Sequence, residues 1–201
     1  MNIQLFGVPV LHKPTNFEIS STELTFVKNL NYNQGEEKEV NISKNSFLLN
    51  SPELERIKNF IIKEAVDYKN NVLEIDNDIY LTQSWSTINT KGKSHHPHGH
   101  RNTFFSIVYY IECEDGNFVL DNYRSSLEKG FFFSYKIKKY NTFNSPRWEF
   151  KVKTKDIIIF PGWIRHYSTV NNSNKERIAI GANFFLKGEL GEYDQYSLIK
   201  I

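Results

Sequence analysis

The sequence predicts a mainly β protein, a jelly roll or sandwich with one supporting helix near its N-terminus. Sixteen Phe, eleven Tyr and three Trp stand among its 201 residues, and aromatic side chains favour strands over helices. Beyond residue 78 the chain consists of short apolar segments separated by turn-forming sequences such as EDGN, NTFNSP and NNSNKE. Several short strands at this spacing are typical of jelly rolls and sandwiches.

One segment predicts a helix, which starts near residue 51. Ser51 can cap the helix and Pro52 suits its first position. Glu53 and Glu55 complement the positive end of the helix dipole. The apolar stripe that follows consists of Leu54, Ile57, Ile61, Ala65 and Tyr68. Because these residues recur at spacings of three and four, we expect this face to pack on a sheet.

The predicted strands follow this helix in chain order. They span residues 79–88, 104–112, 117–121, 130–140, 148–153, 157–160, 166–170 and 177–186. A chain of 201 residues is long enough for one well-buried core and short for two. We therefore expect a single domain, 1–201, with N-terminal strands and the supporting helix in 1–75 and the β core in 76–201.

Charge and cysteine content exclude several classes of protein. The formal net charge is +2, the isoelectric point is about 8.5 and no basic stripe occurs, so nucleic acid is not an expected partner. Cys113 is the single cysteine, which excludes an intramolecular disulfide and fits a reducing compartment. The chain shows neither signal-peptide features at its start nor a long apolar run. We therefore expect a soluble, cytoplasmic protein without a membrane partner.

Four of the six histidines lie within six positions, in the sequence HHPHGH. They are His95, His96, His98 and His100, and His166 follows later in FPGWIRH. Imidazole is the commonest protein ligand of divalent transition metals, and histidines two apart on an extended segment point to the same side. A histidine pair joined by a distal histidine therefore predicts a metal site.

The last two predicted strands are expected to form a hairpin around NNSNKE, with Val170 opposite Arg177 and His166 opposite Gly181. One face would then carry His166, Arg177, Ala179, Gly181 and Asn183, and the other face Ile178, Ile180, Ala182 and Phe184. The first face is small and polar, which suits the floor of a ligand pocket. The second face is apolar, which suits a core.

Arg177 on this hairpin is a candidate for carboxylate binding, because a guanidinium grips a carboxylate in bidentate fashion. The positions of His166 and Arg177 would lie about 13 Å apart at the usual strand rise. This spacing leaves room for a small diacid that contacts a metal at one end and Arg177 at the other. Tyr110 is in step with His98 and His100 along the chain and could add a phenol hydrogen bond to the same carboxylate.

Two motifs of the chain, PHGHRNTFFSIVYYI and IFPGWIRHYSTVNNSNKERIAIGANF, resemble those of the 2-oxoglutarate and iron(II) dependent oxygenases. The resemblance extends to LFGVPV, SPELERIKNFI and SWSTINTKGKSHHPHGH. It implies a double-stranded β-helix, the cupin-like form of the jelly roll, and an enzyme that uses Fe(II), 2-oxoglutarate and O₂ to hydroxylate a small-molecule or peptide substrate. Succinate and CO₂ would be released, and the oligomeric state stays open.

The same resemblance implies roles for individual residues. Fe(II) would be held by His98, His100 and His166, while Arg177 and Tyr110 would bind the C5 carboxylate of 2-oxoglutarate. Most relatives carry Asp or Glu at the position of His100. Three neutral histidines leave the full charge on the metal, which the dianionic co-substrate can neutralise. His95 and His96 are expected to lie behind the ligands or to face solvent.

Two alternatives remain open at the level of the sequence. A metal-dependent cupin is one, because GKSHHPHGH from Gly92 fits a G(x)5HxH motif and Pro161 precedes His166 by five residues. Against it, Phe104 and Phe105 stand where a cupin adds a glutamate. The other alternative is a non-enzymatic jelly-roll protein that binds or builds structure. Metal content and succinate production distinguish the three classes.

Overall fold

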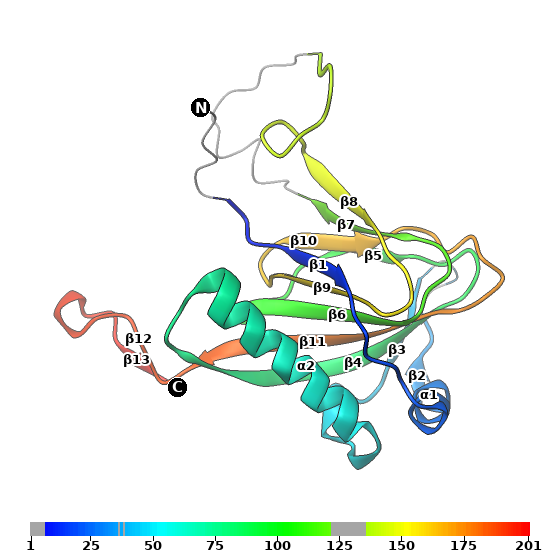
Figure 1. Cartoon of the computed structure of the whole chain (residues 1–201), viewed down its shortest axis with the longest axis horizontal. Coiled ribbons are helices and arrows are strands. Elements are labelled where there is room, and N and C mark those ends of the chain that lie inside the picture. The colour runs from blue at the N-terminus through cyan, green and yellow to red at the C-terminus, as the bar shows by residue number, and fades with distance from the viewer. Residues whose placement is uncertain (1–6, 36, 38, 122–135) are drawn as a thin grey trace.

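The computed structural model describes residues 7–35, 37, 39–121 and 136–201. These residues form two antiparallel sheets that face each other, with helices on the outer side of the larger sheet (Figure 1). This is the mainly β, jelly-roll class that the sequence predicts. Among the described helices, none is both long and apolar enough to cross a membrane.

The larger sheet, as described, has seven strands. In spatial order they are β1 (Leu11–Pro14), β9 (Asp156–Pro161), β6 (Phe105–Glu112), β11 (Arg177–Lys187), β4 (Asp78–Asn89), β3 (Asn41–Ser43) and β2 (Tyr32–Asn33). Strand β11 lies at the centre and pairs with β4 on one side and β6 on the other. The centre of the sheet is therefore built from segments that lie far apart in the sequence.

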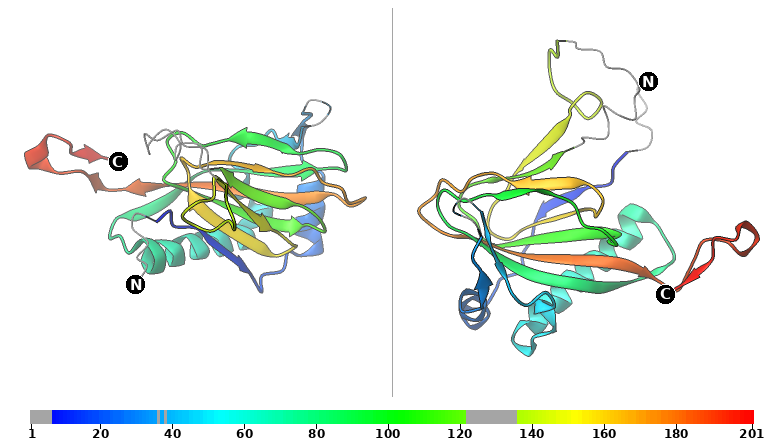
Figure 2. Two further views of the ribbon diagram at one scale, coloured as in Figure 1. Left: turned by 90° about the horizontal axis from the view of Figure 1, so that it is seen from above. Right: turned by 180° about the vertical axis from the view of Figure 1, so that it is seen from behind.

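The smaller sheet has four described strands. In spatial order they are β5 (His95–His98), β10 (Arg165–Ser168), β7 (Asn117–Asp121) and β8 (Arg147–Lys151). A separate hairpin of β12 (Glu189–Leu190) and β13 (Ile199–Lys200) extends away from the body near the C-terminus (Figure 2).

The predicted supporting helix is present as α2 (Glu55–Tyr68), preceded by a 3-10 turn, η2 (Pro52–Leu54), and followed by a π-helical turn, η3 (Lys69–Leu73). Its apolar stripe, Leu54 to Tyr68, is fully buried against the large sheet. Ser51 stands at the expected N-cap position of η2, but its side chain makes no capping hydrogen bond. Two further 3-10 turns, η1 (Leu48–Asn50) and η4 (Tyr193–Gln195), are present among the described residues.

A second helix, α1 (Ser21–Lys28), is not anticipated from the sequence. It starts with a capping box in which Glu23 N–H donates to Ser20 Oγ at 3.2 Å and Ser20 N–H donates to Glu23 Oε2 at 2.7 Å. The pattern Ser-x-x-Glu is a known start signal, so the sequence contained the evidence for this helix.

The alternating side chains of strand β11 face a core on one side of the sheet and a pocket on the other. Ile178, Ile180, Ala182 and Phe184 are buried in the core between α2 and the large sheet, as predicted. Arg177, Ala179 and Gly181 point the other way, toward the space between the sheets. Because side chains alternate along a strand, this one segment supplies both a core face and a pocket face.

Most predicted strands are present with ends shifted by a few residues, namely β4, β6, β7, β8, β9, β10 and β11. The strand predicted at 130–140 lies largely outside the described residues, and its described part, 136–140, is not a strand. The predicted hairpin of the last two strands is wrong. Strand β10 pairs with β5 and β7, whereas β11 pairs with β4 and β6.

The NNSNKE segment therefore crosses between the sheets instead of turning back. Asn171 fixes this crossing from a buried position, since its Nδ2 donates to Asn89 O at 2.7 Å and to Lys175 O at 2.8 Å. The loop is thus held by the end of β4, and His166 and Arg177 meet across the interior from opposite sheets.

Candidate metal and carboxylate site

Three histidines converge in the pocket between the two sheets. His98 ends β5, His100 lies two residues beyond it, and His166 lies opposite His98 on the neighbouring strand β10. One ring nitrogen from each of these three residues lies within 4.8 Å of the others. The pairing of β5 with β10 therefore brings His166 next to His98 and His100, from which the sequence separates it by 66 positions or more.

Two of the three imidazoles are held in one orientation by the backbone. Nδ1 of His98 lies 2.7 Å from the carbonyl oxygen of His96, and Nδ1 of His166 lies 3.0 Å from that of Ile164. A carbonyl only accepts, so each Nδ1 carries the proton and each Nε2 keeps its lone pair. This is the arrangement that orients histidine ligands in metal sites.

The protonation state of the three histidines also suits a metal. Burial lowers the pKa of His166 well below its usual value, and neighbouring His98 lowers it further. Burial lowers the pKa of His98 as well, and burial together with His98 lowers the pKa of His100 to about 4. The three rings are therefore neutral near pH 7, which is the form that binds a cation. Their donors and spacing fit one divalent transition metal.

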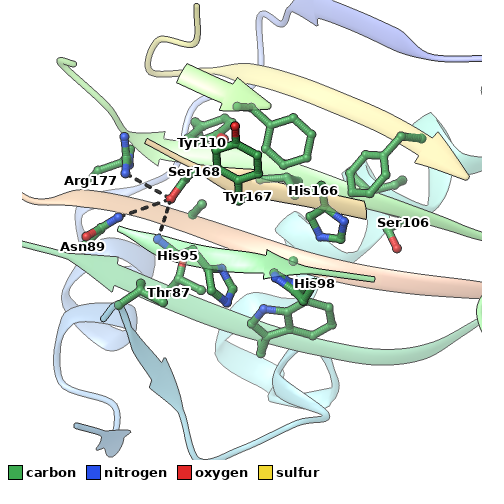
Figure 3. Close-up of a pocket in the computed structure, with 18 of the residues that line it drawn as sticks. Thr87, Asn89, His95, His98, Ser106, Tyr110, His166, Tyr167, Ser168 and Arg177 are labelled. Atoms are coloured by element: carbon green, nitrogen blue, oxygen red, sulfur yellow. Dashed lines mark hydrogen bonds between the residues drawn. The ribbon is translucent and has the colours of Figure 1, made fainter. Parts of the chain in front are cut away.

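Arg177 enters the same pocket from the start of β11 and is 3% exposed. Nη2 donates to Ser168 Oγ at 3.2 Å (Figure 3) and to Thr169 O, and Nη1 donates to Asp115 O at 3.2 Å. With the Asn89 amide turned so that both its ends are satisfied, Asn89 Oδ1 accepts from Nη2 at 2.6 Å.

All these partners of Arg177 are neutral. Within the described residues, no Asp or Glu carboxylate forms an ion pair with its guanidinium. A buried cation is costly without a counter-charge. The pocket is therefore suited to an anionic ligand at this end.

Gly116 determines where the guanidinium lies. A Cβ at Gly116 would stand 1.7 Å from Arg177 Nη1, and its φ is +130°. Only glycine combines this close approach with that backbone conformation. The residue belongs to the EDGN turn before β7, so its turn signal was visible in the sequence, whereas its contact with Arg177 was not.

Tyr110 lines the pocket beside Arg177 from strand β6 and is 3% exposed. Burial raises its pKa above the usual value, while the charge of Arg177 acts in the opposite direction. The phenol is therefore neutral and able to donate. Among the described residues its hydroxyl has no hydrogen-bond partner, so it is available to a ligand.

The predicted pocket face is correct for Arg177, Ala179 and Gly181, but Asn183 does not line the pocket. Instead, Asn183 Oδ1 accepts from Ser106 Oγ at 2.8 Å in the interior. The indole of Trp85 occupies the space above Gly181, because a Cβ there would lie 2.5 Å from the ring. Trp85 also lies beside His100, with ring centroids 5.2 Å apart.

His95 was expected to lie behind the ligands or to face solvent, and its place in the pocket lining was not predicted. It lines the same pocket as the three histidines, and burial with the surrounding imidazoles lowers its pKa to about 3. His96 behaves as expected, since its side chain is 59% exposed and its Nδ1 lies 3.1 Å from Glu39 Oε2. Pro97 was a signal for the irregular strand that turns His95 inward, because proline within a sheet marks edges and bulges.

Fold and site together define a jelly-roll protein with a three-histidine centre and a buried cation in one pocket. Comparison with family models matches residues 83–183 to the family described as "Putative 2OG-Fe(II) oxygenase". This match spans half of the chain and includes every residue of the site described above. The protein belongs to the 2-oxoglutarate and Fe(II) dependent oxygenases, which use Fe(II), 2-oxoglutarate and O₂.

Solved structures with this fold include three that differ widely in source. An oxidoreductase of the 2OG-Fe(II) oxygenase family from Burkholderia pseudomallei has 13% identity, a TM-score of 0.61 and coverage of 88% of this chain and 84% of that one. HygX from Streptomyces hygroscopicus, with nickel, 2-oxoglutarate and hygromycin B bound, has 13% identity and a TM-score of 0.59. The alignment covers 88% of this chain and 82% of that one.

A prolyl hydroxylase from Trichoplax adhaerens, in complex with a peptide fragment of hypoxia inducible factor, has 15% identity and a TM-score of 0.57. The alignment covers 90% of this chain and 86% of that one. At these identities the likeness concerns the fold. No match was found among curated protein sequences.

Proposed function

We propose that His98, His100 and His166 hold the Fe(II) of this oxygenase and that Arg177 and Tyr110 bind the C5 carboxylate of 2-oxoglutarate. The observation that carries the proposal is the shared pocket. Three neutral imidazoles converge at one end, and a buried guanidinium without an acidic partner among the described residues lies at the other. A diacid that chelates at one end and pairs at the other satisfies both.

Each residue then has a defined task. The backbone carbonyls of His96 and Ile164 keep the Nε2 atoms of His98 and His166 directed at the metal. Arg177 supplies the charge and Tyr110 a hydroxyl donor for the far carboxylate. When held by these residues, Fe(II) would supply the redox chemistry by which O₂ converts 2-oxoglutarate to succinate and CO₂ and hydroxylates the substrate.

We further propose that the substrate is a small molecule or a peptide and that the chain acts as a single domain. Its net charge of only +2 supports no preference for nucleic acid. Cys113, the single cysteine, is buried with a free thiol, which supports placing the enzyme in the reducing interior of the cell.

The test is a pair of anaerobic titrations, Mn(II) first and 2-oxoglutarate second, followed by succinate measurement with Fe(II) and O₂. The wild type should bind about one metal per chain, as one facial triad requires. Alanine at His98, His100 or His166 should abolish metal binding, whereas His96→Ala, a neighbouring exposed histidine, should retain it. If His100→Ala keeps full affinity while His96→Ala loses it, the ligand assignment is wrong.

A further inference from the structure

His95 faces the pocket because of an irregularity in strand pairing. His98 lies opposite His166 and His95 lies opposite Ser168, so three steps along β5 match two steps along β10. In a regular strand, residues three apart point to opposite faces. The extra residue forms a bulge, and bulges re-aim side chains. His95 and His98 therefore both point inward (Figure 3).

This position lies between the two ends of the site. The ring of His95 stacks obliquely beside the ring of His98, with centroids 4.3 Å apart. Its backbone N–H donates to Ser168 Oγ at 3.1 Å, and the same oxygen accepts from Arg177 Nη2 at 3.2 Å. A ligand that reaches from the histidine triad to Arg177 must therefore pass close to the His95 imidazole.

The imidazole of His95 has hydrogen-bonding capacity left over. Among the described residues, its ring nitrogens have no hydrogen-bond partner, whereas Nδ1 of both His98 and His166 is engaged by a carbonyl. An imidazole presents at least one N–H donor in either protonation state. His95 is partly buried and lines the pocket, so this N–H is available to a ligand that lies there.

We propose that His95 donates a hydrogen bond to an oxygen of bound 2-oxoglutarate, between the metal and Arg177, and thereby contributes to co-substrate affinity. This inference rests on the proposed function. It assigns His95 to the co-substrate and not to the metal, since the ring nitrogens that converge within 4.8 Å belong to His98, His100 and His166.

The experiment compares His95→Leu and His95→Gln with the wild type in the full chain. Mn(II) affinity is measured first, and 2-oxoglutarate affinity of the Mn(II)-loaded protein is measured second by calorimetry. We expect His95→Leu to keep Mn(II) affinity within about twofold and to weaken 2-oxoglutarate binding about 5- to 10-fold, the effect of one hydrogen bond. His95→Gln keeps an N–H donor and should recover most of this loss.

His96→Leu is the matched control, because it removes the adjacent imidazole from the exposed side of the same strand. It should leave both affinities unchanged. Unchanged 2-oxoglutarate affinity in His95→Leu, or loss of Mn(II) affinity in either His95 variant, would overturn the inference. If His95→Leu does not fold, a His95→Gln protein that binds 2-oxoglutarate tenfold more weakly than wild type also overturns it. Failure of the wild type to bind 2-oxoglutarate refutes the proposed function itself.

Discussion

Arg177 brings a positive charge into the interior and meets only neutral acceptors among the described residues. Backbone carbonyls and the Ser168 hydroxyl orient the guanidinium without neutralising it. Such a group is suited to bind an anion, because an anionic ligand would supply the counter-charge that the described residues do not provide. The same pocket keeps its histidines neutral, so the proposed metal ligands and the charged guanidinium line one cavity.

We predict that Arg177→Ala retains Mn(II) binding but weakens 2-oxoglutarate binding by about 2 to 5 kcal/mol, or roughly 30-fold to several thousand-fold. Arg177→Lys should recover only part of this, since a point charge lacks the planar fork. Titrations of metal and then 2-oxoglutarate provide the measurement, with folding checked by circular dichroism. Unchanged 2-oxoglutarate affinity in folded Arg177→Ala would contradict the co-substrate assignment.

Gly116→Ala tests the positioning of that guanidinium. The new Cβ would lie 1.7 Å from Nη1 and must displace it, so we expect about a tenfold loss of 2-oxoglutarate affinity, or 1.4 kcal/mol. Gly188→Ala is the control, since Gly188 also has a positive φ, +101°, but no atom within 4 Å of its would-be Cβ. Equal effects of the two variants would mean that backbone strain, not Arg177, is responsible.

At the scale of elements, helix α2 supports the site without touching it. Its apolar stripe covers the face of β11 opposite to the pocket, so that Ile178 and Ile180 are fully buried while Arg177 and Ala179 face the ligand side. The helix therefore stabilises the sheet that carries Arg177, and its own packing should affect folding more than binding.

Ile61→Ala on α2 should lower the free energy of unfolding by about 2 to 5 kcal/mol, because Ile61 is 0% exposed and its loss leaves a cavity. Lys63→Ala on the exposed face, where Lys63 pairs with Asp67, should change it far less, because solvent screens a surface ion pair. Urea denaturation measures both. Mn(II) affinity of the folded Ile61→Ala protein should match the wild type, and a lower affinity would show coupling between α2 and the site.

At the scale of the molecule, the pocket links stability to pH. Folded His95 and His100 have pKa values of about 3 and about 4, against an ordinary 6.5. Between these limits the unfolded chain binds more protons than the folded chain, so stability rises with pH. The contribution of these two histidines to stability is complete above about pH 6.5 and is lost as the pH falls toward 4.

We therefore predict that the metal-free protein loses stability below pH 6.5, by up to about 1.4 kcal/mol per pH unit for each histidine with such a lowered pKa. Urea denaturation in the presence of EDTA at pH 7.0, 6.0 and 5.0 measures the slope. His95→Gln should show a shallower slope over this range, where carboxylates contribute little. An identical slope in wild type and His95→Gln would mean that His95 does not titrate in this way.

The sequence by itself determined those features that depend on local pattern. The stripe from Leu54 to Tyr68 fixed the buried face of α2, and alternation along β11 separated Ile178 and Ile180 from Arg177 and Ala179. The residues His98, His100, His166, Arg177 and Tyr110 were identified as one site, and the structure places all of them in one pocket. Periodicity is a property of neighbouring residues, which is why the buried face of α2 and the alternation of β11 could be predicted, whereas the roles of the five site residues stay predictions.

Only the tertiary structure decided which segments meet. Strand β10 joined the small sheet and β11 the large one, because pairing partners are selected by contacts distant in the sequence. The bulge opposite His95 reset the alternation of β5, and the approach of Gly116 to Arg177 joined a turn to a strand 61 residues later. A one-residue change in register reverses the direction of every side chain beyond it, so the local pattern of β5 could not place His95 in the pocket.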